Sequence, residues 1–77
     1  MTIEQFVSVF AGALDGVKPG ELCADTAFKK LPTWDSLAIL TVTDAIEVEF
    51  SVLLTKTDFA AAETIQDLYE VVKTKKG

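Results

Sequence analysis

Apolar residues recur at the spacing of an amphipathic helix in three segments of the chain, and no segment alternates as a β-strand would. The first segment has its apolar residues on one helical face: Ile3, Phe6, Val7, Phe10 and Leu14. We expect a helix from Ile3 to Leu14, ended by Asp15-Gly16. Thr2 is its expected N-cap, and Gln5 three residues later completes a capping box.

The second periodic segment predicts a helix from Ser36 to Phe50, with Asp35 as its N-cap. The expected core stripe of this helix is Ile39, Val42, Ile46 and Phe50. A short helix is expected from Thr57 to about Ala61, because its first residues suit a helix start. The last helix is expected from Ile65 to Lys73, capped by Thr64. Its apolar side consists of Ile65, Leu68, Tyr69 and Val72.

Residues 15–35 show neither the helical nor the strand period. The chain-breaking residues of this segment are Gly16, Pro19, Gly20 and Pro32. A loop this long is unusual in a small domain unless it has a function. We expect Leu22, Phe28 and Leu31 to enter the core and hold the loop, and Cys23 to be a small buried filler. The expected fold is therefore all-α: a bundle of three main helices plus one short helix, with a long first loop.

The length and the cysteine content bound the class of protein. A chain of 77 residues suits one domain with one core, which we expect to span residues 1–77. The longest apolar runs are too short to cross a bilayer, and the first residues do not resemble a secretory signal. Cys23 is the only cysteine, so a reducing cytoplasm is the expected compartment.

The residue types that the chain lacks narrow its chemistry. It has no histidine and no arginine, which excludes imidazole metal sites, Ser-His-Asp triads and Cys-His dyads. A net charge of −5 repels nucleic acid and attracts basic protein partners. Carboxylate pairs such as Glu47 and Glu49 are interpreted as solvated helix faces. We therefore expect no enzymatic activity and no metal site.

The most informative residue is Ser36, which follows a loop and opens a helix. Free N–H groups and the positive end of the helix dipole make this position favourable for a phosphate. Residues such as Asp35 and Ser36 more often only cap a helix, so the tripeptide alone leaves both interpretations open. In the capping interpretation, the chain is an unmodified helical interaction module.

The stretch Thr33-Trp34-Asp35-Ser36-Leu37 is similar to the Trp-Asp-Ser-Leu attachment motif of acyl and peptidyl carrier proteins. Other segments also resemble this family, over nearly the whole chain: Asp25-Thr26-Ala27-Phe28, Ile46-Glu47-Val48-Glu49-Phe50, Asp58-Phe59 and Thr64-Ile65-Gln66-Asp67-Leu68. The resemblance implies an acyl-carrier-like bundle in which Trp34, Asp35 and Leu37 support attachment at Ser36.

The resemblance also implies a cofactor and partners. A phosphopantetheinyl transferase uses coenzyme A and Mg²⁺ to attach 4′-phosphopantetheine to Ser36, and other enzymes then load and process an acyl group carried as a thioester. We expect a monomer acting in fatty-acid, polyketide or another specialised biosynthesis. An aminoacyl or peptidyl carrier is the alternative. Thr33 stands where many fatty-acid carriers have glycine, and the second helix is less acidic than theirs.

The solvent side of the second helix is the expected partner-recognition surface. At 100° per residue, Leu37, Thr41, Asp44 and Val48 form a stripe opposite the core residues, and Leu40 and Glu47 flank it. Two apolar residues beside Ser36, bracketed by acidic ones, favour a docking surface with an apolar centre and a charged rim.

Overall fold

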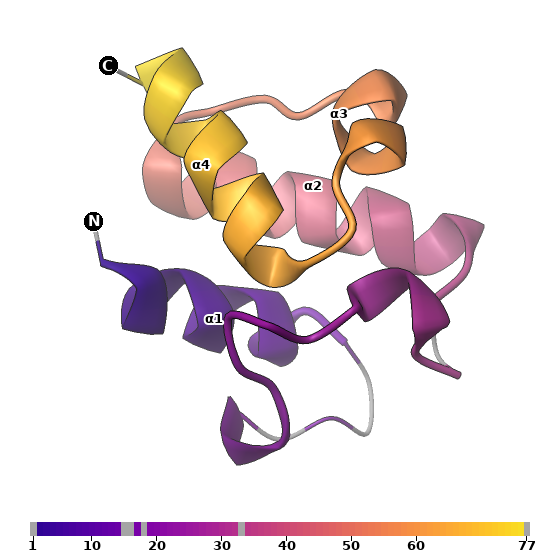
Figure 1. Ribbon diagram of the computed structural model, residues 1–77. Helices are drawn as coiled ribbons and strands as arrows, with labels where there is room; N and C mark the ends of the chain where they lie inside the picture. The colour runs from indigo at the N-terminus through magenta and orange to yellow at the C-terminus, as the bar shows by residue number, and fades with distance from the viewer. Residues whose placement is uncertain (1, 15–16, 18, 33, 77) are drawn as a thin grey trace.

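The computed structural model describes residues 2–14, 17, 19–32 and 34–76, and over this range it contains helices and no strand (Figure 1). The elements in chain order are α1 (Ile3–Gly12), the 3₁₀ turns η1 (Pro19–Glu21) and η2 (Phe28–Lys30), α2 (Ser36–Phe50), α3 (Lys56–Ala61) and α4 (Ile65–Lys76). In Figure 1, α4 lies in front of α2, α3 stands above the N-terminal half of α2, and α1 lies below. The predicted all-α bundle of three main helices and one short helix is confirmed.

The start of α1 is as predicted, but its end is earlier. The side chains and backbone N–H groups of Thr2 and Gln5 bond reciprocally at 3.0 and 3.2 Å, which forms the expected capping box. The helix ends at Gly12 rather than Leu14, because glycine weakens a helix and the N–H of Leu14 turns to the carbonyl of Ala11, three residues back. The predicted Asp15-Gly16 stop lies outside the described residues.

The bounds of α2 are as predicted, whereas its buried stripe is slightly rotated. Asp35 caps the helix at its N-terminus, and Ser51 ends it in the left-handed conformation with φ of 59°. Val42, Ile46 and Phe50 are buried as expected, but the fourth buried position is Ala38. Ile39, which was expected in the stripe, packs against the core but is only partly buried.

The last two helices differ from the prediction at one end each. α3 begins at Lys56 with Thr55 as its N-cap, rather than at Thr57, because Thr55 and Asp58 form a capping box. α4 has the predicted cap, since the N–H of Asp67 donates to the hydroxyl of Thr64 at 3.2 Å. It continues beyond Lys73 to Lys76, where Lys75 pairs with Asp58 at 3.1 Å and Lys76 Nζ donates to the carbonyl of Phe50 at 3.0 Å.

The core is one cluster that draws on every helix and on the first loop. Its fully buried large side chains are Phe6, Phe10, Phe28, Ile46, Ile65, Leu68, Val42 and Val72. In the loop, Leu22 and Phe28 are buried and Leu31 packs against the cluster, as predicted. The prediction for Cys23 was wrong, since its side chain is exposed. Leu22 occupies the inward position, so the next residue faces solvent, and the N–H of Cys23 bonds to Thr26 Oγ1 at 2.9 Å.

Two capping carboxylates make the stability of the bundle sensitive to acid. The backbone N–H groups of Glu63 and Thr64 donate to Asp67 and lower its pKa below the ordinary 3.8. Burial raises the pKa of Asp58, but hydrogen bonds from Thr55 and Lys75 lower it by more, so the net shift is also downward. A lowered folded-state pKa means that the ionised form stabilises the fold above pH 3.8, and that this stabilisation is lost as the pH falls through the folded-state pKa.

We therefore expect the urea midpoint to fall steeply below pH 3.8, and Asp67→Asn to reduce this fall. The measurement is urea unfolding of both proteins at neutral pH and in acid. Asp44→Asn is the control, because Asp44 is exposed and makes no hydrogen bond to the described part of the chain. An acid dependence that Asp67→Asn leaves unchanged would contradict the assignment.

No helix in the described ranges is both long enough and apolar enough to cross a membrane.

Candidate functional site

Ser36 is placed by the turn that leads into α2. The N–H of Trp34 donates to the carbonyl of Leu31 at 3.0 Å, and Asp35 then adopts an extended conformation. The carboxylate of Asp35 accepts the N–H of Ala38 at 2.8 Å. These bonds make Ser36 the first residue of α2, with its side chain exposed to solvent.

The start of α2 fits a phosphodiester on Ser36. The Asp35 side chain occupies the N–H of Ala38, while the N–H groups of Ser36 and Leu37 meet no acceptor within the described part of the chain. The first turn of α2 contains no acidic side chain. Two unpaired N–H groups at the positive end of a 15-residue helix favour an anion there without an arginine.

Trp34 packs the loop against the bundle, as predicted. Its ring stacks on Phe10 with centroids 5.7 Å apart and planes 10° apart. Its ring centroid also lies 4.9 Å from that of the buried Phe28, in an edge-to-face arrangement, and 5.7 Å from that of Phe59. Three aromatic partners from α1, η2 and α3 therefore hold the residue two positions before Ser36. Thr33, the first residue of the motif, lies outside the described residues.

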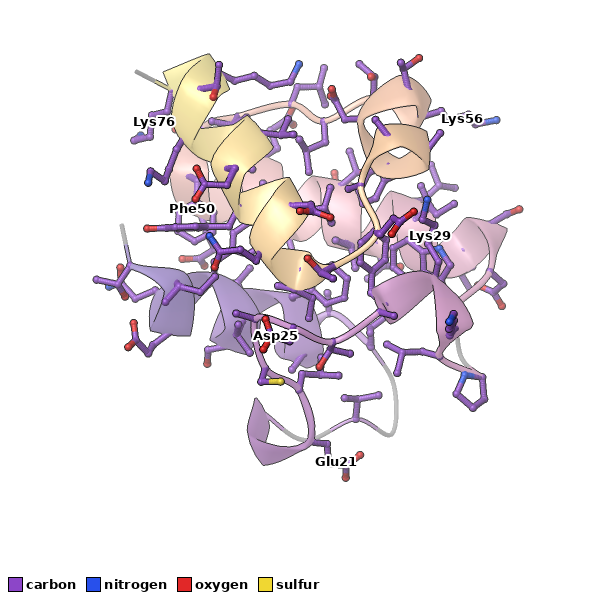
Figure 2. The ribbon with its side chains drawn as sticks, in the orientation of Figure 1. Glu21, Asp25, Lys29, Phe50, Lys56 and Lys76 are labelled. Atoms are coloured by element: carbon purple, nitrogen blue, oxygen red, sulfur yellow. The ribbon has the colours of Figure 1, made fainter. Side chains whose placement is uncertain are left out.

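Three hydrogen bonds join the first loop to α3 and to the start of α4. The carbonyls of Ala24 and Thr26 accept the N–H groups of Gln66 and Ile65, at 2.9 and 3.2 Å, where α4 begins. Lys29 Nζ donates to the carbonyl of Ala60 at 3.0 Å, and Figure 2 shows Lys29 between η2 and α3. The loop that leads to Ser36 is therefore held against α3 and α4. No sequence pattern indicated the Lys29 contact, which joins residues 31 positions apart.

All six residues of the expected partner-recognition surface, which we call the α2 face, are exposed: Leu37, Leu40, Thr41, Asp44, Glu47 and Val48. The apolar side chains among them are 69% (Leu37), 67% (Leu40) and 76% (Val48) exposed, and Thr41, Asp44 and Glu47 are exposed beside them. The sequence reasoning missed Leu53, which is 59% exposed between the buried Val52 and Leu54. The exposure of Leu53 could have been predicted from the sequence, because neighbouring side chains of an extended segment point to opposite sides.

The described residues contain no cluster of three or more His, Cys, Asp or Glu side chains that could hold a metal. Glu47 and Glu49, the carboxylate pair interpreted as a solvated face, are both exposed. The start of α2 therefore offers the hydroxyl of Ser36 beside the N–H groups of Ser36 and Leu37, which meet no acceptor within the described residues.

Comparison with protein families gives one match. The model of the family described as "Phosphopantetheine attachment site" matches residues 4–72, a range that includes Ser36 and the whole of α1 to α3 except the first residue of α1. Proteins of this family carry 4′-phosphopantetheine covalently. No curated protein and no solved structure matches the chain.

Proposed function

The chain belongs to the phosphopantetheine-attachment family, and on this premise we propose that it is an acyl carrier protein modified on the hydroxyl of Ser36. The supporting observation is the position of Ser36, which is exposed at the first residue of α2 beside two amides without acceptors in the described chain. Residues 1–77 are proposed to act as one carrier domain.

In this proposal, each residue of the motif has a separate task. Ser36 is a substrate hydroxyl for a transferase, so no histidine base is required in this chain. Asp35 ends the loop and leaves the amides of Ser36 and Leu37 free for the phosphate, while Trp34 anchors the loop. The bound arm supplies a terminal thiol, which holds a cargo as a thioester. The tether raises the effective concentration of that cargo at each partner enzyme.

The experiment that tests the carrier function is the transfer reaction itself. The purified chain is incubated with coenzyme A, Mg²⁺ and a broad-specificity phosphopantetheinyl transferase, and its intact mass is measured. We expect the mass of one phosphopantetheine to be added. A chain that is folded and yet gains no mass would support the interaction-module alternative. Subsequent loading with acyl and with aminoacyl donors separates an acyl carrier from an aminoacyl carrier.

We further propose that the α2 face recognises the transferase and the pathway enzymes. Its apolar side chains lie within a few turns of Ser36, and Asp44 and Glu47 give it a negative rim. A partner with a complementary positive rim would be steered toward it at a rate that depends on salt.

We expect Glu47→Lys to slow transfer of phosphopantetheine at low salt, with a smaller effect at high salt, where charges are screened. The side chain of Glu47 is exposed and makes no bond within the described residues, so folding should be unaffected. Glu63→Lys is the matched control, since it reverses an exposed carboxylate between α3 and α4. Equal transfer rates for the two variants at low salt would exclude the α2 face as the transferase contact.

A further inference from the structure

A groove runs between α1 and α2 on the side of the bundle next to the α2 face. Its volume is about 470 Å³, and it is lined by Gly12 and Ala13 from the end of α1 and by Ala45 and Val48 from α2. The groove exists because three of these residues have no side chain or only a methyl group. A Cβ added to Gly12 would have no heavy atom within 4 Å, so the space above this residue is open.

The rim of this groove is acidic and unpaired. Asp44 and Glu49 line it, both are exposed, and neither makes an ion pair or a hydrogen bond within the described residues. Among the described residues, no lysine lines the groove itself. Lys76 lines the adjoining hollow together with Glu49 but donates to the carbonyl of Phe50 and forms no ion pair with Glu49. Both carboxylates therefore remain available to a cationic partner, which would gain Coulomb energy there.

The shape and the charge together favour a helix as the occupant. The lining residues of α2 span Thr41 to Glu49, roughly 12 Å or two helical turns at 1.5 Å per residue. Two turns of an amphipathic helix present apolar side chains at i, i+4 and i+7, which suits a long apolar floor. Lysine or arginine on the flanks of that helix would meet Asp44 and Glu49.

Two other occupants fit the groove poorly. A second copy of the chain in a symmetric dimer would bring the same acidic rim against itself, because the same surface patch is used by both subunits. An anionic lipid surface would be repelled by the same two carboxylates. The groove also continues directly into the α2 face, since Thr41, Asp44 and Val48 line it.

We propose that the α1–α2 groove is a docking site for a basic amphipathic helix of a partner protein, whose leucine-like side chains lie over Gly12, Ala13 and Ala45 while its cations pair with Asp44 and Glu49. Docking therefore involves α1 as well as α2. The proposal does not require modification of Ser36. Docking in the groove can therefore fail while the carrier function holds, and the carrier function can fail while docking holds.

The test uses a synthetic helical peptide of about 15 residues with leucines on one face and lysines on its flanks. The unmodified chain is titrated with it, and the backbone amide signals are followed by NMR. We expect the signals of Gly12, Ala13 and Ala45 to shift, with an affinity that falls as salt is added. A companion peptide with glutamate in place of lysine should not bind.

The deciding variant is Gly12→Lys, which adds a cation to the groove without a steric clash. Gly20→Lys is the control, because Gly20 in η1 also accepts a Cβ in open space and the change in net charge is the same. We expect Gly12→Lys to weaken the lysine peptide about tenfold or more, equivalent to at least ~1.4 kcal/mol, and Gly20→Lys to bind as the wild type does. Thermal melts check that both variants fold.

Three results would overturn the proposal. Equal weakening by the two lysine variants would mean that only net charge matters. Shifts confined to Leu37 and Leu40 would mean that the peptide binds the α2 face without the groove. Concentration-dependent shifts of the groove signals in the free chain would mean that a second copy occupies it.

Discussion

Replacing Ser36 with alanine is expected to abolish phosphopantetheine attachment and to leave the bundle folded. The variant removes the only atom of this residue that could form the phosphodiester. The Ser36 side chain is exposed and makes no hydrogen bond within the described ranges, and alanine favours a helix. Intact mass after incubation with coenzyme A, Mg²⁺ and transferase should therefore show no addition, while the helical circular dichroism stays that of the wild type.

Ser8→Ala is the matched control for this experiment. Ser8 is also an exposed serine on a helix, but it lies within α1 rather than at a helix start. We expect this variant to gain one phosphopantetheine at the wild-type rate. If Ser36→Ala still gained the group, or if Ser8→Ala lost it, the attachment site would have to be reassigned.

Ile46→Ala is expected to be the most destabilising of the single changes considered. Ile46 is 0% exposed at the centre of α2 and belongs to the core cluster shared by all the helices. Truncation of a buried isoleucine typically costs about 2–5 kcal/mol, through lost burial and the cavity left behind. A small domain has a total stability of about 5–15 kcal/mol, so the variant loses a large share of it. Urea unfolding should show a much lower midpoint with an unchanged slope.

Glu47→Ala provides the control at the adjacent position. Its side chain is exposed, and its only contribution to the cap of α2 is a backbone carbonyl, which accepts the N–H of Ser51 and is retained in alanine. We expect a midpoint close to that of the wild type. If Ile46→Ala and Glu47→Ala had equal midpoints, α2 would be rotated relative to the core in solution.

Local interactions made several parts of the fold predictable from sequence. Thr2 with Gln5 and Asp35 with Ala38 form caps that join residues three positions apart, so their chemistry is visible in a short window. The position of Ser36 at the start of α2 follows from the second of these caps. The exposure of Leu37 and Val48 follows equally from helical period, because they lie opposite the buried residues of the same helix.

Contacts between distant segments decided the rest. α4 extends to Lys76, whose Nζ donates to the carbonyl of Phe50 at 3.0 Å, and Lys75 pairs with Asp58 at 3.1 Å. The spacing of apolar residues within α4 does not indicate that Phe50 or Asp58 would be its partner. The exchange of Ile39 for Ala38 in the buried stripe has the same origin, because helical period defines a face only to within about one residue and the neighbouring helices decide which residue is covered.

The sequence by itself therefore determined that four helices form, the caps at the starts of α1, α2 and α4, and the solvent side of α2, since each depends on residues within one or two helical turns of each other. The tertiary structure alone decided how the first loop is held, where Cys23 points and that a groove opens between α1 and α2. These features depend on pairs such as Lys29 with Ala60, or Gly12 with Ala45, that are far apart in the chain. Such pairs meet only when packing has set the distances between helices.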